Sequence, residues 1–194
     1  TVAVLADVGA EEVRFAAFDA ALGFAQLRAA LAHGFHLRAD QDDARLEFVA
    51  DRVYRVGDER KSLTVEPFEG FAVSYLLRYP APIGEQSFDF VLTDFDAYRD
   101  QIAPARTFGF MRDLKMLNEL GLGTGGRLDN FILVGEDEVL NTELRFPDEF
   151  VRHKILDVIG DLYLLGYPLR AKVTARLTGH RDNIALLRQL IEED

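Results

Sequence analysis

Apolar residues follow two different spacings in the first half of the chain. Residues 11–31 place large apolar side chains three or four positions apart, which predicts a helix that ends near Gly34. Beyond it the texture changes to short runs rich in β-branched and aromatic residues, separated by turns that contain glycine or proline. We expect these runs to be strands of an antiparallel meander, at residues 46–56, 62–66, 71–79 and 88–93.

The second half alternates between helical and strand patterns. Helical spacing recurs at residues 95–102 and 111–120, and a strand is expected at residues 130–134. Between them lies a glycine-rich loop at residues 121–126. This loop lacks the Lys-Ser/Thr pair that completes a phosphate-binding loop, and it follows a helix where a dinucleotide fingerprint would follow a strand. We therefore interpret it as a connector.

A further helix is expected to begin at Pro147, followed by Asp148 and Glu149, whose charges suit the N-terminal end of a helix dipole. A strand at residues 173–177 and a last helix complete the pattern. The chain therefore predicts an α+β fold in two layers, with helices packed on one face of a mostly antiparallel sheet.

Composition narrows the classes of function. The chain has 194 residues, 48% of them hydrophobic, which suits one large domain or a domain with an added arm. We expect no transmembrane segment, because no run approaches the roughly 18 apolar residues that cross a bilayer. A net charge of −11 argues against a nucleic-acid partner. An anionic small molecule can still bind where Arg152, Lys154 and Arg181 gather.

A histidine and two aspartates recur at intervals of four residues in the helix that follows Pro147. His153, Asp157 and Asp161 therefore line one edge of that helix. Since the chain has no cysteine, a metal would need nitrogen and oxygen ligands, and an imidazole and a carboxylate one turn apart supply them. The alternative is an amphipathic helix whose polar side happens to carry these residues.

His180 stands at the corner between the expected strand at residues 173–177 and the last helix. A histidine at such a corner faces a cleft more often than a core. The alternative is a histidine at a helix start with no partner. With four histidines in the whole chain, two in one neighbourhood favour a site.

Several short motifs around these residues form a recognisable set: Ala105-Arg106-Thr107-Phe108-Gly109-Phe110, Leu140-Asn141, Leu144-Arg145-Phe146, Asp148-Glu149-Phe150-Val151 and Gly179-His180-x-x-Asn183. With the histidine and aspartates above, this set resembles the UDP-3-O-acyl-N-acetylglucosamine deacetylases, zinc-dependent enzymes of lipid A synthesis in Gram-negative bacteria. The resemblance is specific from Phe71 to Leu190 and extends to about Leu46. It implies a cytoplasmic amide hydrolase that acts on a UDP-linked acylated glucosamine.

The resemblance also implies roles for individual residues. His153 and Asp157 would be two ligands of a catalytic Zn²⁺, and Asp161 would hold the imidazole of His180 so that it stays cationic. Thr107 would donate a hydrogen bond to the tetrahedral oxygen, and Phe108 and Lys154 would contact substrate. In the family, the helix and loop at residues 111–126 shape a passage for the acyl chain. Its candidate wall residues are Leu114, Leu122, Leu128 and Leu133, each equally at home in an ordinary core.

The sequence departs from the family pattern in one place. The third zinc ligand and the general base of these enzymes come from a Glu-His pair in an N-terminal domain, and this chain contains no Glu-His dipeptide. The spare histidines, His33 and His36, lie in a segment that does not resemble that motif. We therefore expect residues 46–194 to be the C-terminal catalytic half and residues 1–45 a divergent helical leader. The missing half would be supplied in cis or in trans. The alternative is a non-catalytic binding or scaffold domain.

Overall fold

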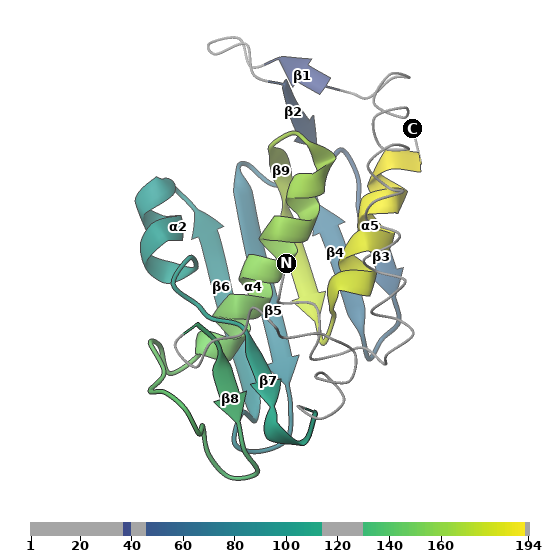
Figure 1. Ribbon diagram of the computed structural model, residues 1–194. Helices are drawn as coiled ribbons and strands as arrows, with labels where there is room; N and C mark the ends of the chain where they lie inside the picture. The colour runs from purple at the N-terminus through teal and green to yellow at the C-terminus, as the bar shows by residue number, and fades with distance from the viewer. Residues whose placement is uncertain (1–36, 40–45, 114–129, 193–194) are drawn as a thin grey trace.

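The fold of the chain was obtained as a computed structural model, which describes residues 37–39, 46–113 and 130–192. Figure 1 shows the elements in chain order. The strands are β1 (Leu37–Ala39), β2 (Leu46–Val49), β3 (Tyr54–Gly57), β4 (Ser62–Glu66), β5 (Phe71–Arg78), β6 (Glu85–Leu92), β7 (Phe108–Phe110), β8 (Ile132–Val134) and β9 (Leu169–Arg176). The helices are α2 (Phe95–Gln101), α4 (Glu149–Leu162) and α5 (His180–Glu192), with short 3-10 turns at Met111–Asp113 and Tyr163–Leu165.

β9 is the central strand of the main sheet, although it is the last strand in the sequence. It pairs antiparallel with β4 and parallel with β5, and its first residues pair with β2. The expected meander is therefore wrong in one respect, because β4 and β5 are not neighbours. The long connection from β5 to β9 contains α4, which gives a parallel pair the crossover it needs. Ala171, Val173 and Ala175 alternate along β9 as buried residues.

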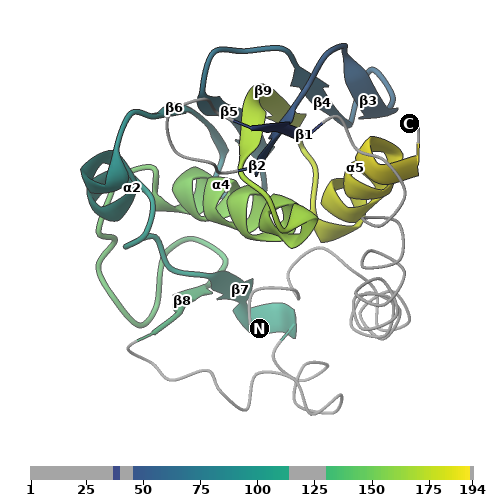
Figure 2. The same cartoon turned by 90° about the horizontal axis from the view of Figure 1, so that it is seen from above.

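The expected α+β class is confirmed. Within the described part of the main sheet, the antiparallel pairs are β1–β2, β3–β4, β4–β9 and β5–β6, and the parallel pairs are β2–β9 and β5–β9. Figure 2 shows α4 and α5 side by side along one face of this sheet. β7 and β8 form a small parallel sheet on the far side of α4. α4 is thus enclosed between two sheets.

Several expected elements differ in their limits. The single strand expected at residues 46–56 is two strands, β2 and β3, and the helix expected at 95–102 is α2. Pro147 precedes α4, because Asp148 is the N-cap and the helix begins at Glu149. Beyond the described residues lie the helix at 11–31, most of the helix at 111–120, the glycine-rich loop, His33, His36, Leu114, Leu122 and Leu128.

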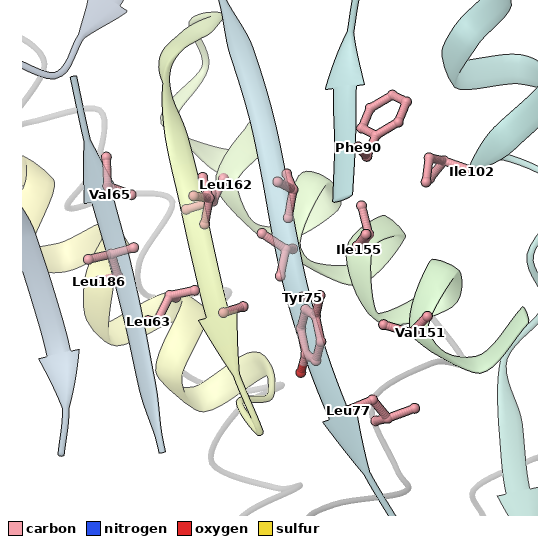
Figure 3. Packing of buried hydrophobic residues seen from close by; sticks show 14 of the residues in the cluster. Leu63, Val65, Tyr75, Leu77, Phe90, Ile102, Val151, Ile155, Leu162 and Leu186 are labelled. Atoms are coloured by element: carbon pink, nitrogen blue, oxygen red, sulfur yellow. The ribbon is translucent and has the colours of Figure 1, made fainter. Parts of the chain in front are cut away.

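The main core lies between the helix layer and the sheet. Val151, Ile155, Val158 and Leu162 recur on one side of α4 at helical spacing and are buried against the strands. Figure 3 shows Val151 and Ile155 of α4 on the side of β5 and β6, and Leu186 of α5 beside the β4 side chains. This packing fixes α4 in the middle of the fold. Among the other buried side chains of α4, Phe150 and His153 pack against Phe108 of β7, and Asp157 lies near His180 at the start of α5.

Candidate active site

Four side chains from α4 and α5 form a contiguous polar cluster. On α4, His153 Nε2 lies 3.4 Å from Asp157 Oδ1. Asp157 Oδ2 lies 3.8 Å from His180 Nε2, and His180 Nδ1 lies 2.7 Å from Asp161 Oδ2. The contacts therefore run in the order His153, Asp157, His180, Asp161. The four-residue spacing puts the α4 members on one edge of that helix, and the β9–α5 corner brings His180 against it.

His153 is held so that one ring nitrogen remains available. Its Nδ1 lies 3.2 Å from the backbone carbonyl oxygen of Ala105. Because a carbonyl can only accept, Nδ1 carries the proton in this hydrogen bond. Nε2 is buried and has no hydrogen-bond partner among the described residues. Burial is the main cause that lowers the pKa of His153, so the ring is neutral and Nε2 presents a lone pair.

Asp157 presents both carboxylate oxygens to the cluster. Oδ1 faces His153, while Oδ2 lies 3.4 Å from the Nζ atom of Lys154 and has no hydrogen-bond partner in the described structure. The Asp157 side chain is only 6% exposed. Asp157 Oδ2 thus faces the ammonium group of Lys154 and the imidazole of His180, whose positive charges offset the cost of burying its own negative charge.

His180 and Asp161 make the shortest contact in the cluster. Asp161 Oδ2 accepts from His180 Nδ1 at 2.7 Å and also from Asn183 Nδ2 at 2.8 Å. Burial lowers the pKa of His180, but the hydrogen bond to Asp161 and the charges of Asp161 and Asp157 outweigh it, and the net shift is upward. The ring is therefore disposed to carry a positive charge beside the neutral ring of His153.

The corner that carries His180 is tied to β5. Leu177 adopts a left-handed backbone conformation with φ of 54°, and its N–H donates to the carbonyl of Leu76 at 2.9 Å. The hydroxyl of Tyr75 donates to the carbonyl of Thr178. A left-handed conformation is unfavourable for leucine and persists here because both hydrogen bonds impose it. These contacts set the position from which α5 starts.

The other expected site residues within the described ranges lie on α4 and on or beside the small β7–β8 sheet. Lys154 is buried and its Nζ atom lies 3.4 Å from Asp157 Oδ2. Thr107 directly precedes β7 and is half-buried, and its carbonyl accepts from the Ile132 N–H at 2.8 Å. Phe108 is 6% exposed and packs edge-on against Phe150 and the ring of His153, at centroid distances of 5.0 and 6.3 Å. Leu133 is buried in β8, opposite Gly109 of β7.

The basic residues noted in the sequence are dispersed. Lys154 joins the cluster, whereas the guanidinium of Arg152 packs over the rings of Phe88 and Phe146, 3.8 and 4.5 Å from their centroids, and bonds to Asp148 at 2.6 Å. Arg181 is exposed on the first turn of α5.

Arg106, Glu149 and Asn183 make polar contacts beside the cluster that the sequence pattern does not predict. All three are buried: Glu149 bonds to Arg106, and Asn183 bonds to Asp161. Each stands within a motif that carries the resemblance, which is the signal that could have singled them out. Glu149 was expected to complement the helix dipole, but it is fully buried and ion-paired.

His153 and Asp157 could supply some of the ligands of a metal site. His153 Nε2 and Asp157 Oδ1 converge as a nitrogen and an oxygen ligand one helical turn apart. Within residues 37–39, 46–113 and 130–192, however, no three or more His, Asp or Glu side chains are arranged so that together they could hold a metal ion. The described part of the chain thus offers two ligands where a catalytic zinc uses three.

Comparison with known proteins decides the family. The family model described as UDP-3-O-acyl N-acetylglycosamine deacetylase matches residues 29–192. The chain belongs to this family. Relatives named UDP-3-O-acyl-N-acetylglucosamine deacetylase include those of Acidithiobacillus ferrooxidans, 47% identical over 69% of this chain and 45% of the relative, and Chromobacterium violaceum, 45% identical over 71% and 46%. That of Alcanivorax borkumensis is 39% identical over 80% of this chain and 52% of the relative.

The matches cover only part of each relative. The chain spans about half the length of the curated relatives it matches. The family match begins at residue 29, inside the segment expected to be a leader, and the division at residue 45 stays a prediction. None of the helices in the described ranges has the length and apolar character needed to cross a membrane.

Proposed function

We propose that this chain is the C-terminal half of a zinc-dependent deacetylase that hydrolyses the N-acetyl group of UDP-3-O-acyl-N-acetylglucosamine. The observation that carries the proposal is the cluster in which a neutral His153 and Asp157 adjoin the His180–Asp161 pair. The names of the relatives support the substrate and the reaction. A cytoplasmic location, implied by the same resemblance, stays a prediction.

His153 and Asp157 would hold the zinc, which when bound would lower the pKa of a water molecule towards neutrality. The buried Nε2 of His153 supports this assignment, because it lacks a hydrogen bond in the described structure and lies 3.4 Å from Asp157 Oδ1, the second ligand atom. A third protein ligand would come from the N-terminal half, in cis or in trans. So would the general base.

The chain's own residues would act on the charge that develops during hydrolysis. Water adds to the acetyl carbonyl carbon, the C–N bond then breaks, and the sugar nitrogen takes up a proton. His180, cationic beside Asp161, would stabilise the developing oxyanion or donate that proton to the departing amine. Thr107 would donate to the same oxyanion, and Lys154 would bind substrate from beside Asp157. Phe108 would contact the substrate, and Leu133 would be one wall residue of an acyl-chain passage. Leu114, Leu122 and Leu128, which lie outside the described residues, stay candidates for the same passage.

A second candidate is a binding or scaffold domain without hydrolysis. It is favoured by the absence of a Glu-His dipeptide and by the lack of a three-ligand group among the described residues. It offers no physical reason for burying a neutral histidine, an aspartate and a cationic histidine side by side. The deacetylase proposal accounts for all three.

The deciding experiment combines this chain with the N-terminal half of a relative and measures acetate release from UDP-3-O-acyl-N-acetylglucosamine. We expect activity only in the combination. His180→Ala should then lower kcat by about 10²–10⁴-fold, the usual contribution of general acid help. Arg188→Ala, exposed on the same helix, is the control and should keep full turnover. An inactive combination, or full turnover with His180→Ala, would favour the scaffold function.

A further inference from the structure

The peptide group between Ala105 and Arg106 is held from both sides by residues of α4. Its carbonyl oxygen accepts from His153 Nδ1 at 3.2 Å, and its N–H donates to Glu149 Oε1 at 3.0 Å. Glu149 and His153 lie four residues apart, one turn of α4, so both reach the same peptide group. A continuous line of hydrogen bonds thus runs from the Glu149 carboxylate through one backbone amide to the ring of His153.

Glu149 is an ionised carboxylate, and hydrogen bonds to both of its oxygens stabilise the charged form. It is 0% exposed, and Arg106 donates to its two oxygens from Nε at 2.9 Å and from Nη2 at 3.1 Å. The N–H of Arg145 donates to Oε2 at 2.6 Å. Burial raises the pKa of Glu149, but these hydrogen bonds outweigh it and hold the pKa below its usual value.

We propose that Glu149 is a positioning residue for His153, acting through the Ala105–Arg106 peptide group to fix and polarise the imidazole as a metal ligand. This inference rests on the proposed function for the identity of the metal. A metal-bound histidine commonly donates its other N–H to a carboxylate or a carbonyl, which fixes its tautomer and raises its basicity. Here the carbonyl of Ala105 accepts directly from His153, and the Glu149 carboxylate accepts from the N–H of the same peptide group.

The physical basis is cooperativity between hydrogen bonds that share a polarisable group. When the amide N–H donates to a carboxylate, the carbonyl of the same amide becomes a stronger acceptor. The stronger acceptor pulls the Nδ1 proton of His153 and leaves more electron density on Nε2. Burial of these residues strengthens the effect, because hydrogen bonds are electrostatically stronger in the low dielectric of the interior.

The same ion pair also has a plainly structural role, and the two roles must be separated. Arg106 donates from Nη1 to Thr142 Oγ1 at 2.8 Å and from Nη2 to the carbonyl of Glu143 at 2.7 Å. Arg106 and Glu149 therefore tie residues 142–145 to the start of α4. A stability measurement alone would report this tie, so the test needs a signal from His153 itself.

The test is NMR of the full chain with ¹⁵N-labelled histidine, first without metal and then during a Zn²⁺ titration. Without metal, His153 should show the Nδ1–H tautomer with a downfield Nδ1 proton. Glu149→Gln should move this proton upfield and lower the apparent Zn²⁺ affinity at His153 by about 10–100-fold, the usual cost of losing such an outer partner. Asp148→Asn is the matched control, since it removes a carboxylate one residue away, and should leave both signals unchanged.

Loss of folding in Glu149→Gln would not end the test. The double variant Arg106→Met/Glu149→Leu removes both buried charges together and avoids an uncompensated one. It should fold and show the same upfield shift. The proposal is overturned if His153 has the Nε2–H tautomer in the parent chain, or if the Nδ1 proton keeps its position in the folded variants. If Zn²⁺ has no effect on the His153 signals of the parent chain, the result counts against the proposed function. The role of Glu149 is still tested by comparing the His153 Nδ1 proton of parent and variant without metal.

Discussion

Asp161, on the last turn of α4, accepts a hydrogen bond at 2.7 Å from Nδ1 of His180, the first residue of α5. This contact joins the two helices that cover the main sheet, and it links residues 19 positions apart in the chain. The same carboxylate oxygen accepts from Asn183, so the orientation of Asp161 is fixed from two directions.

Asn183 should matter because it holds Asp161 in place. Asn183→Leu removes a buried donor to a charged group, which should lower the free energy of unfolding by about 1.5–3 kcal/mol. Asn183→Asp should cost more at neutral pH, because it sets a second carboxylate beside Asp161. Urea unfolding measures both effects. Gln189→Leu, further along α5, is the control. Equal stability of the Leu and Asp variants would contradict this account of Asn183.

Helical spacing was enough to predict, from the sequence, that three of the four cluster residues share one edge of a helix. The intervals between His153, Asp157 and Asp161 are local, and a helix of 3.6 residues per turn fixes their common edge. The pairing of β9 between β4 and β5 was not predictable in this way, since strand order depends on contacts far apart in the sequence. The same limit applies to Glu149, whose partner Arg106 lies 43 residues away. A glutamate in the first turn of a helix gives no local sign that it is buried.

α4 offers a contrast between a packing residue and a site residue. Ile155 is 0% exposed, whereas Ile159 is only partly buried. Ile155→Ala should cost about 2–5 kcal/mol of unfolding free energy, and Ile159→Ala less. His153→Ala in the metal-free chain should cost less than Ile155→Ala, because it also removes a buried unbonded nitrogen. The thermal and urea unfolding midpoints of the three variants show which substitution destabilises the chain most. A His153→Ala midpoint as low as that of Ile155→Ala would identify His153 as a core residue.

Zinc binding by this chain alone should be weak. His153 and Asp157 supply two ligands, so elemental analysis should find little metal after dialysis against a chelator. Because burial lowers the pKa of His153, protonation should compete with zinc only at pH values below the ordinary histidine range. Isothermal titration at several pH values tests this, with His153→Ala as the control. Tight equimolar zinc that survives the chelator would instead indicate a third ligand in this chain, such as His33 or His36.

The two histidines should affect stability at opposite ends of the neutral range. The raised pKa of His180 gives a contribution that is fully present below the unfolded pKa of about 6.5 and is lost as pH rises through the higher folded value. The lowered pKa of His153 gives one that is present above the unfolded value and is lost as pH falls through the folded value. Urea unfolding of the metal-free chain from pH 5 to 9 should therefore lose its alkaline decline in His180→Gln and part of its acid decline in His153→Gln. Unchanged profiles in both variants would contradict the assigned shifts.

Asp161→Asn should separate the charge of Asp161 from its position. Asparagine is nearly the same size and can still accept a hydrogen bond from His180 Nδ1, but it no longer favours the protonated ring. In the combined two-half enzyme, the pKa that governs the basic limb of the pH–rate profile should fall, and kcat at pH 8 should drop more than kcat at pH 6. KM should change little, since a cation that acts on developing charge contributes mainly in the transition state. His180→Ala should abolish this limb altogether. A basic limb that stays in place in Asp161→Asn would mean that another group supplies the proton, and His180 would then lose its assigned role as the acid.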